Sequence, residues 1–284
     1  MEDSHRYLRL LQDSDLRLLS AAADGGVGGL ERWRRDPMAV DALLRGNRLF
    51  ESLFRSQERD PLLVASPFLV FWVLVHRVAW DLERSQFVQE WLGPGRSVPV
   101  FDAASLQEFL AESRRRAFLA ELLASYTRVV SGSIWERTAR GWNRRRYSDL
   151  DPVRLSELAE VVAGEQRSAV LKRLGDLALF LSGVFPEYVV SNPLQPREVE
   201  RMRRLLNVAG PEEVVRAASP EKGLWLLDWL GRSAYRAAAE GAEVGVGELA
   251  GVAHAFHTAR RVLNVLTGRY LYPARERWFP GTGG

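Results

Sequence analysis

The pattern of hydrophobic and polar positions is most distinctive at residues 68–75, where eight apolar side chains follow one another without a polar position. Ser66 and Pro67 stand directly before this run, a hydroxyl suited to cap free amides and a proline suited to the first helical turn. Such a run leaves no polar face over two turns, so other helices must surround it. A membrane span would need about 20 apolar residues. The sequence therefore predicts a buried central helix at about 67–83 and no membrane insertion.

Helical spacing of apolar residues recurs along most of the chain. Each of several helix starts carries an aspartate, whose carboxylate can accept from free amides, followed by a proline that fits the first turn. These pairs are Asp36-Pro37, Asp60-Pro61 and Asp151-Pro152. The spacing predicts long helices at about 102–128, 165–190, 220–240 and 246–271. We expect an all-α fold, an orthogonal or bundle-like array of helices around the central one.

Strand signals are weak. The stretch Val98–Phe101 is short and contains a proline, which argues against a core strand. Between about residues 129 and 149 the helical spacing fails, and we expect an irregular or hairpin-like segment there. We treat residues 1–284 as a single helical domain. If the chain divides, the halves would be 1–130 and 150–284, joined by 131–149.

Composition narrows the function classes. The chain is 46% hydrophobic and 26% charged, which is typical of a folded soluble protein, and it contains no cysteine. Thiol chemistry and cysteine-ligated zinc are therefore excluded. The first residues are polar and acidic without an apolar signal core, so we expect a cytoplasmic protein. The net charge is +3, and all but two of the 39 cations are arginine, a balance that does not by itself indicate nucleic acid.

The least ordinary local composition lies in the segment 131–149, which is rich in arginine and aromatic residues. Arginine pairs with carboxylates and phosphates, and flat rings stack on bases or pack in protein interfaces. The alternative is that the tryptophans dock the segment on the body while the arginines pair with nearby acids. We predict a non-catalytic binding module, with a protein partner or homo-oligomer preferred over single-stranded nucleic acid. The predicted contact residues are Trp135, Arg137, Arg140, Trp142, Arg144, Arg145, Arg146 and Tyr147.

The alternative function is a helical protein with an interior pocket that binds an apolar ligand or cofactor, with or without catalysis. Its weak candidate residues are His76, the one histidine near the core, and the acids Asp81, Asp176 and Glu187 in otherwise apolar helices. A histidine that lines a pocket can act as an acid, a base or a ligand. Whether the protein is an enzyme stays open, and the sequence implies no cofactor.

A metal site has one weak candidate, the pair His254 and His257, which are three residues apart. Both project roughly opposite to the apolar face of their predicted helix, so we expect a surface pair and no metal. The sequence also lacks a Walker loop, a Gly-x-Ser-x-Gly elbow and a His-Glu-x-x-His motif.

Overall fold

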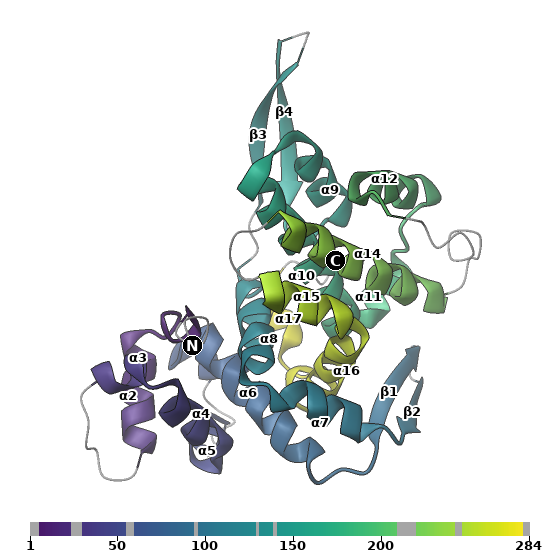
Figure 1. The fold of residues 1–284 in the computed structure, drawn as a ribbon. Helices are drawn as coiled ribbons and strands as arrows, with labels where there is room; N and C mark the ends of the chain where they lie inside the picture. Colours follow the sequence, from purple (N-terminus) through teal and green to yellow (C-terminus); the bar gives the residue numbers. More distant parts are fainter. Residues whose placement is uncertain are drawn as a thin grey trace.

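The computed structural model of the protein describes residues 6–23, 30–54, 60–93, 96–128, 131–138, 141–208, 220–241 and 246–280. Figure 1 shows an array of packed helices from which a two-stranded ribbon, β3 and β4, stands out. The helices are α2 (Asp13–Ala22), α3 (Glu31–Arg35), α4 (Pro37–Arg45), α5 (Asn47–Phe54), α6 (Pro67–Leu82), α7 (Ala103–Ala111), α8 (Ser113–Ser125), α9 (Pro152–Val161), α10 (Gly164–Val184), α11 (Pro186–Ser191), α12 (Pro196–Leu206), α14 (Pro220–Glu240), α15 (Val246–His254), α16 (Phe256–Leu266) and α17 (Arg275–Trp278). The strands are β1 (Val88–Gly93), β2 (Arg96–Val100), β3 (Ser131–Thr138) and β4 (Gly141–Ser148).

The predicted all-α fold with a central buried helix is confirmed. The Ser66 hydroxyl accepts from the Leu69 amide at 3.2 Å, and Pro67 begins α6. Helices α4, α5, α7, α8 and α16 all pack against α6, so its apolar residues from Phe68 to Val75 are buried on every side. Nearly all of the buried hydrophobic side chains among the described residues form one cluster that runs from Tyr7 to Phe279. Within the described ranges, no helix combines the length and apolar character that crossing a membrane requires.

Glycines let the long helices α10 and α14 approach their neighbours closely. A Cβ at Gly231 of α14 would lie 2.2 Å from Cζ of Phe256 and 3.0 Å from Cβ of Ala178. A Cβ at Gly175 of α10 would lie 2.6 Å from the Tyr235 ring. Both aromatic rings are fully buried, so neither can move into solvent to make room. These glycines therefore set how close the helices of the second half pack.

The N-terminal helices are tied to the body by polar contacts over long sequence distances. The buried Asp15 carboxylate accepts from the Ser66 amide at 2.8 Å, which fixes α2 against the start of α6. The Tyr7 hydroxyl donates to Glu248, at the start of α15. Arg6 pairs with Glu121 of α8 at 2.7 Å. Burial raises the pKa of Glu248 above its ordinary value, although the Tyr7 hydrogen bond opposes this.

Three predicted helices differ from the structure in their continuity. The helix expected at about 102–128 is divided at Glu112, whose backbone is extended, into α7 and α8. The helix expected at 246–271 is divided at Ala255 and ends in a π-helix, Thr267–Leu271. The helix expected at 165–190 ends at Val184 because Pro186 has no amide hydrogen to donate to Ser182.

The last carbonyls of α10 accept hydrogen bonds from side chains of other helices in place of backbone amides. The Asn264 amide nitrogen donates to the carbonyls of Ser182 at 3.1 Å and Gly183 at 2.8 Å. Arg275 donates to the Val184 carbonyl at 3.2 Å. Residues of α16 and α17 thus donate to the carbonyls at the end of α10. The local sequence could not reveal these partners.

The hairpin of β1 and β2 was missed by the sequence analysis, which had set aside the stretch that contains Pro99. The two strands pair antiparallel, with Val88 opposite Val100 and Gln89 opposite Pro99. Proline is tolerated because this sheet has only two strands, so each strand has a free edge.

Candidate functional site

The hairpin of β3 and β4 is the part of the chain that stands out from the helical body (Figure 1). Its strands pair antiparallel, with Ser133 opposite Arg146, Trp135 opposite Arg144, and Arg137 opposite Trp142. Cross-strand partners, and residues two apart in one strand, share a face of a sheet. The register therefore places five predicted contact residues on one face: Trp135, Arg137, Trp142, Arg144 and Arg146.

The opposite face has a different composition. Ile134 pairs with Arg145, Gly132 pairs with Tyr147, and Glu136 is opposite an asparagine. Two further predicted contact residues, Arg145 and Tyr147, thus belong to this second face, which holds one cation and one acid. Arg140 lies outside the described residues. The predicted contact set is therefore split by the register into a basic, tryptophan-rich face and a mixed face.

The foot of the hairpin is anchored to the body by an ion pair. Asp149 follows β4 directly and lies 3.0 Å from Arg173 of α10, with both side chains largely buried. Arg173 also donates to the Ser125 hydroxyl at 2.6 Å, and its guanidinium lies over the Tyr126 ring at 3.8 Å from the ring centroid. The direction in which the hairpin leaves the body is therefore set at α8 and α10.

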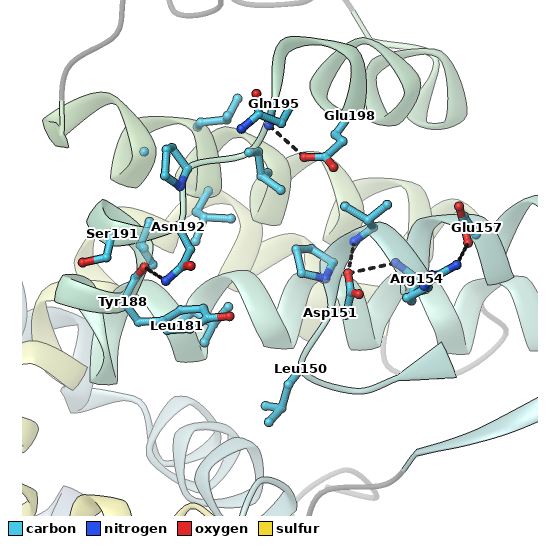
Figure 2. Close-up of a pocket in the computed structure, with 18 residues that line it drawn as sticks. Leu150, Asp151, Arg154, Glu157, Leu181, Tyr188, Ser191, Asn192, Gln195 and Glu198 are labelled. Atoms are coloured by element: carbon cyan, nitrogen blue, oxygen red, sulfur yellow. Dashed lines mark hydrogen bonds and ion pairs between the residues drawn. The ribbon is translucent and has the colours of Figure 1, made fainter. Parts of the chain in front are cut away.

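A cleft of about 680 Å³ opens beside this foot, between α9, α11, α12 and α14 (Figure 2). Asp151 caps α9 at its edge, accepting from the amides of Val153 at 2.9 Å and Arg154 at 3.1 Å. The volume is within the range of clefts that hold small molecules or partner side chains. The cleft is lined by Leu150, Asp151, Pro152, Val153, Arg154, Glu157, Leu181, Tyr188, Val189, Ser191, Asn192, Pro193, Leu194, Gln195, Glu198, Gly223, Leu226 and Leu227.

The polar groups of this cleft are engaged with one another. Arg154 lies 3.0 Å from Glu157, which also lies 2.9 Å from Arg201. Glu198 accepts from the Gln195 amide at 2.8 Å, and both lie across the cleft from Leu181 in Figure 2. Buried leucines such as Leu181 supply the apolar part of the lining. The lining of this cleft is therefore mixed, with leucine side chains beside paired charged groups.

His76, the candidate of the pocket hypothesis, belongs to a buried ionic network. Its Nε2 lies 3.3 Å from Nε of Arg116, and Arg116 Nη2 lies 2.6 Å from the Asp41 carboxylate. Arg116 also donates to the carbonyls of Leu110 and Ala111, which ends α7 at this point. An open cleft of about 790 Å³ beside α6 is lined in part by His76 and Arg116. The Nε2 lone pair of His76 is occupied by Arg116, so His76 holds the network in place.

Protonation of His76 is expected to make stability depend on pH. Burial, with the positive charge of Arg116, lowers the pKa of His76 from 6.5 to about 3. Burial alone would raise the pKa of Asp41, but the Arg116 hydrogen bond leaves it below its ordinary value. Between pH 6.5 and 3 the unfolded chain binds a proton at residue 76 that the folded chain does not, so stability falls as the pH falls. The largest slope is about 1.4 kcal/mol per pH unit.

Urea denaturation of the wild type and of His76→Gln at several pH values between 7 and 3 measures this slope. Glutamine can accept from Arg116 but does not titrate, so the variant removes the proton and keeps the acceptor. The difference in unfolding free energy between the two proteins should shrink as the pH falls below 6.5. Parallel curves over the whole range would show that His76 is not the linked group.

The other acids of the pocket hypothesis each have a separate basic partner. Asp81 lies 3.3 Å from both Arg77 and Arg269 and accepts from the Tyr270 hydroxyl. Asp176 lies 2.8 Å from Lys172 and accepts from the Tyr235 hydroxyl at 2.8 Å. Glu187 pairs with Arg275. No hydrogen bond or ion pair among the described residues joins any two of His76, Asp81, Asp176 and Glu187.

The two C-terminal histidines lie at the surface of α15 and α16. His254 is exposed, and Nδ1 of His257 lies 3.2 Å from Asp228 and 3.1 Å from Arg260. Asp228 lies beside His257, but over the ranges that the structure describes no group of three or more histidine, aspartate or glutamate side chains could hold a metal ion.

Sequence reasoning missed Asp41 and Arg116, which complete the His76 network, and the residues around β1. Asp41 and Arg116 are 75 positions apart, and each looks like an ordinary helical charge. Only the improbable burial of a charged residue on an apolar helix face could have signalled them. Comparisons of this chain with protein-family models, with curated proteins and with solved structures find no match.

Proposed function

We propose that the protein is a non-catalytic binding module whose contact surface is the basic face of the β3 and β4 hairpin. The observation that carries the proposal is the strand register, which gathers three arginines and two tryptophans on one face. Aromatic residues and arginines are the side chains most often found to carry binding energy in interfaces. A ribbon anchored at its foot presents them with little loss of backbone freedom on binding.

The partner that fits this face best is a protein surface with carboxylates and apolar side chains. Arginine forks pair with carboxylates in a bidentate manner, and tryptophan covers apolar surface while its indole N–H finds an acceptor. Leu150, two residues after β4, lines the cleft of Figure 2, which places apolar leucines and charged side chains together beside the hairpin foot. A protein partner, including a second copy of this chain, can contact both features at once.

Single-stranded nucleic acid is the second candidate, because arginine binds phosphate and tryptophan stacks on unpaired bases. The register favours nucleic acid because each tryptophan of this face lies opposite an arginine, Trp135 opposite Arg144 and Trp142 opposite Arg137. It ranks second because the cleft at the foot is lined by the acids Asp151, Glu157 and Glu198, which would repel a backbone that extended there.

Reversal of two charges on the basic face tests the proposal. The variant Arg144→Glu with Arg146→Glu should lose its partner, because reversed charges repel carboxylates or phosphates alike. A matched control reverses two exposed arginines near the other end of the fold, Arg9→Glu with Arg17→Glu. The measurement is affinity capture from the source cells with quantitative mass spectrometry, repeated after nuclease treatment, and thermal unfolding checks that all three proteins fold.

We expect the wild type and the control to capture a partner protein, with or without nuclease treatment. The hairpin variant should capture at least about tenfold less of that protein. Material that disappears after nuclease treatment would assign the face to nucleic acid. Equal capture by all three proteins would remove the hairpin face from the function.

A further inference from the structure

The cleft at the foot of the β3 and β4 hairpin carries negative charge, whereas one face of the hairpin beside it is basic. The charged residues of its lining are Asp151, Arg154, Glu157 and Glu198, three acids and one cation. Glu157 is paired with Arg154 at 3.0 Å and with Arg201 at 2.9 Å. Asp151 and Glu198 form no ion pair with another described residue, so the unbalanced negative charge of the cleft is theirs.

Asp151 and Glu198 each use one carboxylate oxygen to cap a helix. Oδ1 of Asp151 accepts from the amides of Val153 and Arg154 at the start of α9, and Oε2 of Glu198 accepts from the Gln195 amide at the start of α12. Both residues are half-buried and line the cleft, one from the α9 side and one from the α12 side (Figure 2). The amides offset part of each charge, and the second oxygen of each carboxylate has no hydrogen-bond partner among the described residues. A cation that enters the cleft can pair with both.

Leucine side chains supply the apolar part of the lining. Leu181, Leu226 and Leu227 are buried, and Tyr188 adds a half-buried ring. A tryptophan ring covers apolar surface of this kind, and an arginine beside it pairs with carboxylates. The cleft therefore matches an arginine and a tryptophan that enter it together.

Such a pair stands near the tip of the hairpin. Arg137 lies opposite Trp142 on the basic face, and the next pair, Thr138 opposite Gly141, is the last one described. Six residues separate Arg137 from the first residue of β3, which is about 20 Å at ~3.3 Å per residue. Asp149 holds the foot on α10, and the ribbon stands out from the body (Figure 1). The tip is therefore held away from the cleft beside its own foot.

A second copy of the chain can bring this pair to the cleft. When two hairpins lie side by side and antiparallel, the tip of each reaches the foot of the other, because both have the same length. Each copy then gives one tip and receives one, so the contact has two-fold symmetry and closes at the dimer.

We propose that the protein is a dimer of this kind, in which Arg137 of each copy pairs with Asp151 and Glu198 of the other. Trp142 then covers the leucines of the same cleft. This assignment rests on the proposed function, because it takes the basic face of the hairpin as the contact surface and names a second copy as its partner. The complementary charges of the hairpin face and the cleft are the observation that supports it.

A charge exchange between two variants tests this contact. Arg137→Glu places a carboxylate against the acids of the other copy, and Glu198→Arg places a cation against Arg137. Each variant alone should therefore dimerise at least about tenfold more weakly than the wild type. In a mixture of the two variants, residues 137 and 198 have opposite charges at both contacts, so the mixed dimer should regain most of the wild-type strength.

Analytical ultracentrifugation of the purified full chains at micromolar concentrations measures dimerisation, and native mass spectrometry separates the mixed dimer from the parent species by mass. Arg17→Glu, the reversal of an exposed arginine of α2, is the matched control and should dimerise like the wild type. Its mixture with Glu198→Arg should stay weaker than the charge-exchange mixture, because only one of the two contacts is attractive. Recovery in the mixture also separates pairing from misfolding, since a variant that had lost its fold would not regain dimerisation.

Three results would each overturn the dimer: a wild type that sediments as a monomer, a wild-type dimer that neither variant weakens, or a mixture that dimerises no better than its components. The proposed function would survive them if Arg144→Glu with Arg146→Glu still lost a captured protein. The two failures are distinguishable because sedimentation uses the purified chain alone, whereas capture uses the source cells.

Discussion

Replacing Asp41 by alanine is expected to lower the free energy of unfolding by about 3 to 5 kcal/mol. Arg116 is 4% exposed, and its guanidinium is directed to Asp41, His76 and the end of α7. Without the carboxylate, the folded protein keeps a buried positive charge that only neutral groups contact. A buried charge that loses its partner costs far more than an exposed one because water cannot solvate it.

Arg45→Ala is the matched control for this change. Arg45 lies 2.9 Å from the same Asp41 carboxylate, but its side chain is 67% exposed, so its removal should cost at most about 1 kcal/mol. Urea denaturation of both variants measures the difference. The double variant Asp41→Ala with Arg116→Met should recover part of the loss, since it removes the stranded charge as well. A cost for Asp41→Ala no greater than that for Arg45→Ala would show that water reaches Arg116 and solvates its charge.

Gly231→Ala is expected to cost about 3 kcal/mol, the upper part of the range for overpacked cores. The new methyl group would lie 2.2 Å from Cζ of Phe256, whose ring is fully buried beside Tyr235. Either the ring leaves its position or α14 moves away from α16. Chemical denaturation gives the cost, and Phe256→Leu in the Gly231→Ala background should restore part of it, because the two sites share one volume.

Gly251→Ala provides the control for the intrinsic effect of alanine in a helix. A Cβ at Gly251, in α15, meets nothing within 4 Å. The substitution should therefore stabilise the protein by about 0.5 to 1 kcal/mol through the reduced freedom of the unfolded chain. If both glycine variants changed stability equally, the close approach at Gly231 would not be what limits packing there.

Local chemistry made part of the fold predictable. Ser66-Pro67 and Asp151-Pro152 each mark a helix start in which a side chain accepts from a backbone amide of the first turn, and the structure shows both hydrogen bonds. The uninterrupted apolar run indicated the buried helix α6, because consecutive apolar side chains predict burial without knowledge of their neighbours in the fold. The same reasoning found the segment 131–149 by the failure of helical spacing.

The misses share a physical cause, which is contact between residues distant in sequence. The division of the helix at Glu112 depends on Arg116 contacts that belong to a network with Asp41 on another helix. The pair of Arg261 with Glu90 joins α16 to β1, and the strands β1 and β2 were too short and too polar to show alternation. Which hairpin residues share a face also depended on the register, since a shift by one residue would have exchanged the two faces.

The contact between Tyr7 and Glu248 has a consequence for synthesis on the ribosome. The two residues are 241 positions apart, so the hydrogen bond cannot form until α15 has left the exit tunnel. At about 5 to 20 residues per second, the N-terminal residues wait roughly 10 to 50 s. The contacts of this region with the start of α6, Tyr7 on Phe68 and Asp15 with the Ser66 amide, need far less of the chain and can form much earlier in synthesis.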